Sequence, residues 1–128
     1  MDIKILQLHK RASYQYKFIQ DKYAFNELKN CFALADGTTQ SFNSEIWAEI
    51  LTKQFALSPE NEIQKLITDF TSYVKDYQNT EVVFSSNPAK ASLERAKQKM
   101  GGTATFIGLN FLSNNEFNVI SCGDTNLF

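Results

Sequence analysis

The chain has 128 residues, of which 43% are hydrophobic, so it is long enough in principle for a single folded core. Its formal net charge of −1 gives no electrostatic case for binding nucleic acid or an anionic membrane. No apolar run approaches the roughly 20 residues that a membrane span needs. Residues 1–5 do not have the basic and then apolar pattern of a signal peptide, so none is expected. Cys31 and Cys122 lie in apolar strand patterns, which predicts two buried thiols in a cytoplasmic protein.

The first third of the chain has the pattern of extended structure. Apolar residues in the segment 3–8 predict a short first strand, and the aromatic-rich segment 16–25 predicts a second. A polar turn is expected at 27–30, followed by a strand over the apolar run 31–35.

The apolar spacing then becomes helical. A first helix is expected to begin at 43–44, a second at 58–60 and a third at 87–88, and Gly101 ends the third. The side chains expected to face a sheet are Trp47, Ile50, Leu51, Phe55, Ile63, Phe70 and Val74, with Leu93, Ala96 and Met100 on the third helix.

Two further strands, at 103–112 and 117–122, are expected to form a hairpin around a turn at 113–116. Strands, then helices, then strands indicate a layered α+β domain. The chain ends on the apolar pair Leu127-Phe128, which predicts a sheet edge that another chain covers, with self-association through that edge.

Asp36 and Gly37 stand where an apolar strand gives way to a helix. A carboxylate beside an unobstructed glycine carbonyl offers two hard oxygen ligands suited to Mg²⁺ or Mn²⁺. An Asp-Gly pair is also a common turn, and for the pair alone this alternative stays open. The carboxylate of Asp21 on a neighbouring strand and the polar segment 38–44 favour a metal site.

Four segments occur in an informative order: Gln20-Asp21, 36–41, 101–105 and Gly123-Asp124-Thr125. Together they resemble metal-dependent Ser/Thr protein phosphatases of the 2C type, and the resemblance runs from about Gln20 to Phe128. It implies a β-sandwich flanked by helices on both faces, and residues 1–128 would be the N-terminal portion of this single domain, its first half or somewhat more. It also implies hydrolysis of phosphoserine or phosphothreonine in a phosphoprotein substrate, with a water activated by two Mn²⁺ or Mg²⁺ ions.

The resemblance assigns a role to each site residue. Asp36 would bridge the two metal ions, and Gly37 would offer its carbonyl oxygen. Asp21 would orient ligands or water, and Asp124 would hold an additional metal ion. Lys17 would contact the phosphate, as a point charge.

Two departures from the family pattern weaken the catalytic interpretation. Gln20 stands where the family often has Glu, and Tyr16 lies near the place of its phosphate-binding arginine, whose bidentate geometry the neighbouring Lys17 cannot reproduce. The other metal ligands of the family belong to the second half of the domain. We therefore expect this chain alone to be inactive or nearly so. The alternative is a degenerate phosphatase-like domain that binds a partner without catalysis.

Overall fold

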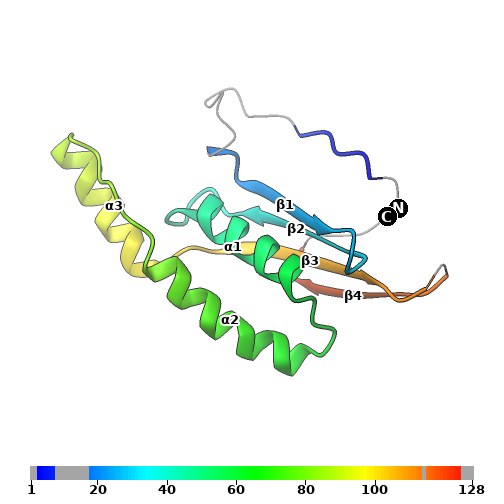
Figure 1. The fold of residues 1–128 in the computed structure, drawn as a ribbon. Coiled ribbons are helices and arrows are strands. Elements are labelled where there is room, and N and C mark those ends of the chain that lie inside the picture. Colours follow the sequence, from blue (N-terminus) through cyan, green and yellow to red (C-terminus); the bar gives the residue numbers. More distant parts are fainter. Residues whose placement is uncertain (1–2, 8–17, 114, 125–128) are drawn as a thin grey trace.

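The computed structural model describes residues 3–7, 18–113 and 115–124, which contain a four-stranded antiparallel sheet and three helices (Figure 1). The α+β class and the order of strands, helices and strands are confirmed. The strands, in their order across the sheet, are β1 (Asp21–Asn26), β2 (Cys31–Gly37), β3 (Ala104–Phe111) and β4 (Phe117–Cys122). The helices α1 (Ser44–Leu57), α2 (Ile63–Gln78) and α3 (Pro88–Met100) lie between β2 and β3 in sequence.

The two faces of the sheet follow from the alternation of side chains along β2. Cys31, Ala33 and Ala35 are fully buried on the first sheet face, which α1 covers (Figure 1). Their small size lets the helix approach closely. Phe32 and Leu34, with the opposite orientation, belong to the second sheet face, and no described helix makes extensive contact with it.

The core lies between the first sheet face and the helices. The ring of Phe55 on α1 packs against Gly108, where an added Cβ would lie only 2.5 Å from that ring. The same ring meets Phe106 edge to face, with centroids 5.4 Å apart. Leu66 and Tyr73 bury one side of α2 against this cluster. A glycine in the middle of β3 therefore provides the space that Phe55, the largest fully buried side chain of α1, fills.

Two of the three predicted helix starts are confirmed. α1 follows Asn43, and α3 follows Asn87, whose side-chain oxygen accepts hydrogen bonds from the backbone N–H groups of Ala89 (3.0 Å) and Lys90 (3.2 Å). Asn87 is thus a regular N-cap, and Pro88 occupies the first turn as expected.

The predicted start of the second helix at 58–60 is wrong. Ser58 ends α1, because its N–H donates to the Gln54 carbonyl at 2.9 Å. The Glu60 carboxylate then accepts hydrogen bonds from the N–H groups of Asn61 (2.7 Å) and Glu62 (2.8 Å). These local bonds compete with helical ones in the segment 60–62, and α2 begins only at Ile63.

Several burial predictions are also wrong. Leu51 and Phe55 are buried, and Trp47, Ile50 and Phe70 are partly buried against the core, but Ile63 (63% exposed) and Val74 lie on the outer side of α2. α3 has a single buried residue, Ala91, on the side of the helix opposite Leu93, Ala96 and Met100, so these three face solvent. The spacing of apolar residues in the sequence predicts that each helix has an apolar side, but α2 and α3 have apolar residues on more than one side, and the spacing does not determine which side meets the core.

The predicted strand at 3–8 is wrong for residues 3–7, which form neither helix nor strand, and Leu8 lies outside the described residues. Of the predicted strand at 16–25, residues 16–17 lie outside the described residues, and within 18–25 the strand begins only at Asp21. The predicted edge at Leu127-Phe128 also lies outside the described part of the chain. None of the helices in that part combines the length and hydrophobicity that a bilayer crossing requires.

The two cysteines differ, contrary to the prediction that both are buried. Cys31 is fully buried, whereas Cys122 is exposed at the end of β4. Burial raises the pKa of the Cys31 thiol, whose sulfur lies 3.6 Å from the Ala56 carbonyl oxygen. With Ellman's reagent we expect one thiol to react promptly in the folded protein and the second only after unfolding. Cys122→Ser should remove the fast phase, and a fast phase that persists would contradict this assignment.

Candidate metal centre at one end of the sheet

The antiparallel register of β1 and β2 brings two predicted site residues together. Asp21 at the start of β1 pairs directly with Asp36 near the end of β2. Both follow the orientation of Phe32 and Leu34, so their carboxylates belong to the second sheet face. Asp36 is exposed and Asp21 is half-buried. Two acidic side chains 15 positions apart in sequence are therefore direct cross-strand neighbours.

Gly37 follows Asp36 and must be glycine for steric reasons. An added Cβ would lie 2.7 Å from the backbone carbonyl carbon and oxygen of Ser44, at the start of α1. The Gly37 N–H donates to the Gln20 carbonyl at 3.0 Å, which ties the end of β2 to the residue before Asp21. The chain can therefore pass from the end of β2 to the start of α1 this closely because this position lacks a side chain.

The polar segment after Gly37 is fixed to the start of β3. The Thr38 N–H donates to the Thr103 carbonyl at 2.9 Å. The Ser41 hydroxyl accepts from the Thr103 N–H at 3.0 Å and lies 3.0 Å from the Thr38 carbonyl oxygen. Phe42 N–H donates to the Gly101 carbonyl at 3.2 Å. Two of the sequence motifs, separated by some sixty residues, are therefore one hydrogen-bonded unit.

The amide of Gln20 joins the same unit. Its oxygen accepts a hydrogen bond from the Thr39 hydroxyl at 2.9 Å, and its nitrogen donates to the Ser44 hydroxyl at 3.3 Å. Gln20 therefore braces the loop that carries Thr39 against β1. This bracing uses both ends of a neutral amide, its oxygen as acceptor and its nitrogen as donor.

The fourth motif lies at the same end of the sheet, two strands away. Phe106 on β3 pairs with Cys122 on β4. One residue further along the antiparallel strands, Gly123 lies beside Thr105, which in turn pairs with Asp36 on β2. Gly123 has φ +91°, and an added Cβ there would lie 2.8 Å from the Thr105 side chain. Asp124 follows in a bend and is exposed. Strand spacing separates β2 from β4 by roughly 10 Å.

A pocket of about 380 Å³ lies on the second sheet face beside the acidic pair. Asp21 and Asp36 line it together with a mostly apolar floor, and the segment 4–7 forms its wall. The Gln7 side chain donates to the Asp21 carbonyl, which fastens that segment to β1. The floor residues Tyr23, Phe32 and Leu34 were not predicted as site residues. The sequence does contain a signal for them: along β2, small side chains alternate with large ones. This alternation places Asp36 on the same sheet face as the large residues Phe32 and Leu34.

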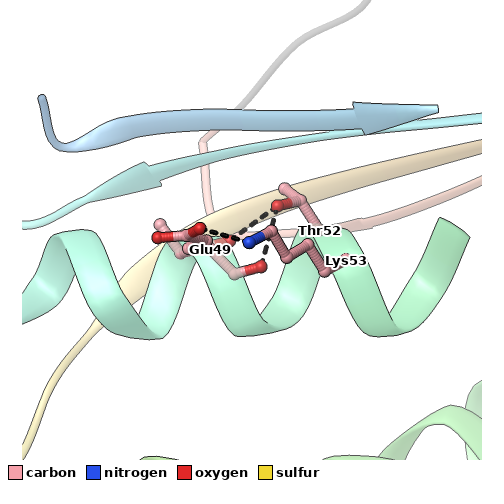
Figure 2. Close-up of polar contacts among 4 residues, drawn as sticks. Glu49, Thr52 and Lys53 are labelled. Atoms are coloured by element: carbon pink, nitrogen blue, oxygen red, sulfur yellow. Dashed lines mark hydrogen bonds and ion pairs between the residues drawn. The ribbon is translucent and has the colours of Figure 1, made fainter. Parts of the chain in front are cut away.

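Polar residues beneath α1 form no second site. Thr52 is fully buried, but its hydroxyl lies 3.0 Å and 3.1 Å from the carbonyl oxygens of Ala48 and Glu49 within the helix (Figure 2). Lys53 pairs with Glu49 on the surface of α1. Lys22 on β1 is also buried there, and this burial lowers its pKa while Glu49 acts in the opposite direction. In the described residues, no buried side-chain nitrogen or oxygen lacks a hydrogen-bond partner.

The described residues contain no close group of three or more His, Cys, Asp and Glu side chains of the kind that holds a metal ion. Asp21 and Asp36 are brought together, and Asp124 stands apart at the same end of the sheet. Lys17, the predicted phosphate contact, lies outside the described residues. Comparison with protein-family models, with curated proteins and with solved structures found no match to this chain.

Proposed function

We propose that this chain supplies part of the divalent-metal centre of a phosphoprotein phosphatase of the 2C type, with Asp21, Asp36 and Gly37 as its share of that centre. The observation that carries the proposal is the direct pairing of Asp21 with Asp36 across β1 and β2. Like charges placed directly opposite destabilise a sheet, and a divalent cation bound by the two carboxylates would offset that cost.

The oxygen ligands available here are of the kind that Mn²⁺ and Mg²⁺ prefer, but there are too few of them to complete the coordination of an ion. Both ions prefer hard oxygen ligands, which two carboxylates and the Gly37 carbonyl would supply. When bound, two such ions supply a water of lowered pKa and a clamp on the phosphate oxygens. Asp36 would be the ligand that the two ions share, and the contacts of Gly37 and Ser41 fix the end of β2 that carries it. Asp21 would orient the ligands around it, and Asp124 would serve a further, weaker site.

The second sheet face agrees with the finer fold that the resemblance implies. It carries large apolar side chains, among them the exposed Phe117 and Val119, and no described helix packs extensively on it. In a β-sandwich such a face packs against a second sheet. We propose that the second half of the domain would provide that sheet together with the remaining carboxylates, so this chain alone would hydrolyse a phosphoserine or phosphothreonine substrate at close to background rate.

One observation favours the non-catalytic alternative. Gln20 stands where the family often has a carboxylate, and its amide braces Thr39 and Ser44. A residue used for loop support adds no charge to the centre. A domain that kept this architecture while losing metal affinity would act as a binding module for a partner protein.

Metal binding separates the two functions. We expect the chain to bind Mn²⁺ with a dissociation constant in roughly the millimolar range, because few carboxylates offset the dehydration of the ion. Asp36→Asn and Asp21→Asn should each weaken binding by about tenfold or more, since each removes a charge and keeps the shape. Binding is read from the loss of the free Mn²⁺ electron paramagnetic resonance signal during titration.

Asp69→Asn is the matched control for this titration, because Asp69 lies on α2, remote in the fold from the acidic pair. It should leave Mn²⁺ binding unchanged. Equal effects of Asp36→Asn and Asp69→Asn would show that the ion binds nonspecifically and would support the binding module instead.

A further inference from the structure

The outer edge of β4 is the least protected part of the sheet. β4 ends the strand order β1-β2-β3-β4, and the described residues place no strand beside it. Five of its six residues are exposed. Backbone N–H and C=O groups along such an edge form a template on which another strand can pair.

β4 also lacks the features that usually block edge pairing. Its sequence, Phe-Asn-Val-Ile-Ser-Cys, contains neither charge nor proline, and its register with β3 runs without a bulge. The opposite edge differs, because β1 begins with Asp21 and Lys22 and the Gln7 side chain donates to the Asp21 carbonyl. Among the described residues, one edge of this sheet is therefore protected and the other is open.

We propose that β4 pairs antiparallel with β4 of a second copy of this chain, so that two sheets join into one across a two-fold axis. Pairing of β4 with β1 of another copy would be head to tail and would form an open-ended fibre, and it would also require the protected edge. Pairing of β4 with itself is closed, and a strand without charges meets no like charge in its own copy.

The faces of the sheet and the charges at the strand ends select one register. Directly opposite residues of antiparallel strands share a face, so the axis must pass through a residue and not between two. An axis at Ile120 would set Glu116 opposite Asp124 of the other copy. An axis at Val119 sets Glu116 opposite Cys122 and pairs Val119 with itself. The Val119 axis therefore avoids opposed acids and still uses the whole strand.

This register also covers exposed apolar surface. Phe117 is 50% exposed and Val119 is 43% exposed, and both belong to the second sheet face, where Phe117 pairs with Phe111 and Val119 with Leu109. In the dimer Phe117 stands opposite Ser121 and diagonal to Val119 of the other copy, within reach of an aromatic ring. The joined strands thus bury the apolar side chains that β4 leaves exposed.

Sedimentation velocity across the micromolar range tests the proposal. Wild-type protein should change from monomer to dimer as its concentration rises. Val119→Lys should weaken dimerisation by about tenfold or more, because it places two ammonium groups opposite each other at the axis. Val83→Lys is the matched control, because Val83 is 85% exposed and lies between α2 and α3, and it should dimerise like wild type.

Cross-linking tests the register and does not depend on the lysine variant folding. In a Cys122→Ser background, Val119→Cys should give a covalent dimer with a short bismaleimide, and Val83→Cys should not. Native Cys122 should not cross-link, because the Val119 axis separates the two copies of this residue by roughly 20 Å along the strands.

A monomer at every concentration would overturn the proposal and would indicate that another segment of the chain or another protein covers β4. A dimer that Val119→Lys and Val83→Lys affect equally would also overturn it. Cross-linking through Cys122 but not through residue 119 would overturn the register.

Discussion

Replacing Phe55 by Ala is expected to lower the free energy of unfolding by about 3–5 kcal/mol. The Phe55 side chain is 1% exposed, and it fills the space that Gly108 leaves in β3 while contacting Phe106 edge to face. Neither neighbour can close the resulting cavity, because one is a glycine and the other belongs to a central strand. Urea unfolding followed by circular dichroism, with the slope unchanged, gives the free energy directly.

Leu57→Ala provides the matched control, since it truncates another apolar residue two positions later on α1. Leu57 is 62% exposed, so its truncation should change the free energy of unfolding by less than about 0.5 kcal/mol. Similar losses in the two variants would mean that the described packing of α1 on β3 is wrong.

Local signals in the sequence predicted much of this fold. The Asn87-Pro88 start of α3 needed only a capping side chain and a fixed φ, and both act within one helical turn. The strand β2 and the hairpin of β3 and β4 were equally visible, because alternation and a polar turn operate over a few residues. Such features succeed as signals because their causes are short-range.

Features set by tertiary contacts were not predictable in the same way. α2 and α3 each carry apolar residues on more than one side, and only the contacts of Leu66, Tyr73 and Ala91 determine which side is buried. The segment 58–60 has the composition of a helix start, yet Glu60 bonds its own neighbours and delays the helix. In each case several arrangements satisfied the local pattern.

The candidate site likewise has one part that local sequence signals predict and one part that depends on tertiary contacts. A tight turn at 27–30 between β1 and β2 fixes the hairpin register, so the pairing of Asp21 with Asp36 was accessible from the sequence. The bonds from Ser41 to Thr103 join residues 62 positions apart and depend on the whole helical layer lying between them. No pattern in either segment predicts that contact, although it fixes the loop that follows the strand end carrying Asp36.

A protein that joins this chain to the second half of a 2C-type domain is expected to show Mn²⁺-dependent hydrolysis of an aryl phosphate, and Asp36→Asn should lower its rate by at least about a hundredfold. The substitution removes the charge proposed to lie between two metal ions, whereas the loop contacts of Gly37 and Ser41 remain to preserve the local fold.

The assay compares four samples: this chain alone and the joined protein, each with and without Mn²⁺. The chain alone should stay near background, because Asp21 and Asp36 are the only carboxylates among the described residues that line the pocket. Asp69→Asn should leave hydrolysis by the joined protein unchanged, because that residue lies on α2. Hydrolysis that survives Asp36→Asn, or that resists a chelator, would mean that the acidic pair does not hold the catalytic metal, since loss of a bridging carboxylate should weaken both metal positions together.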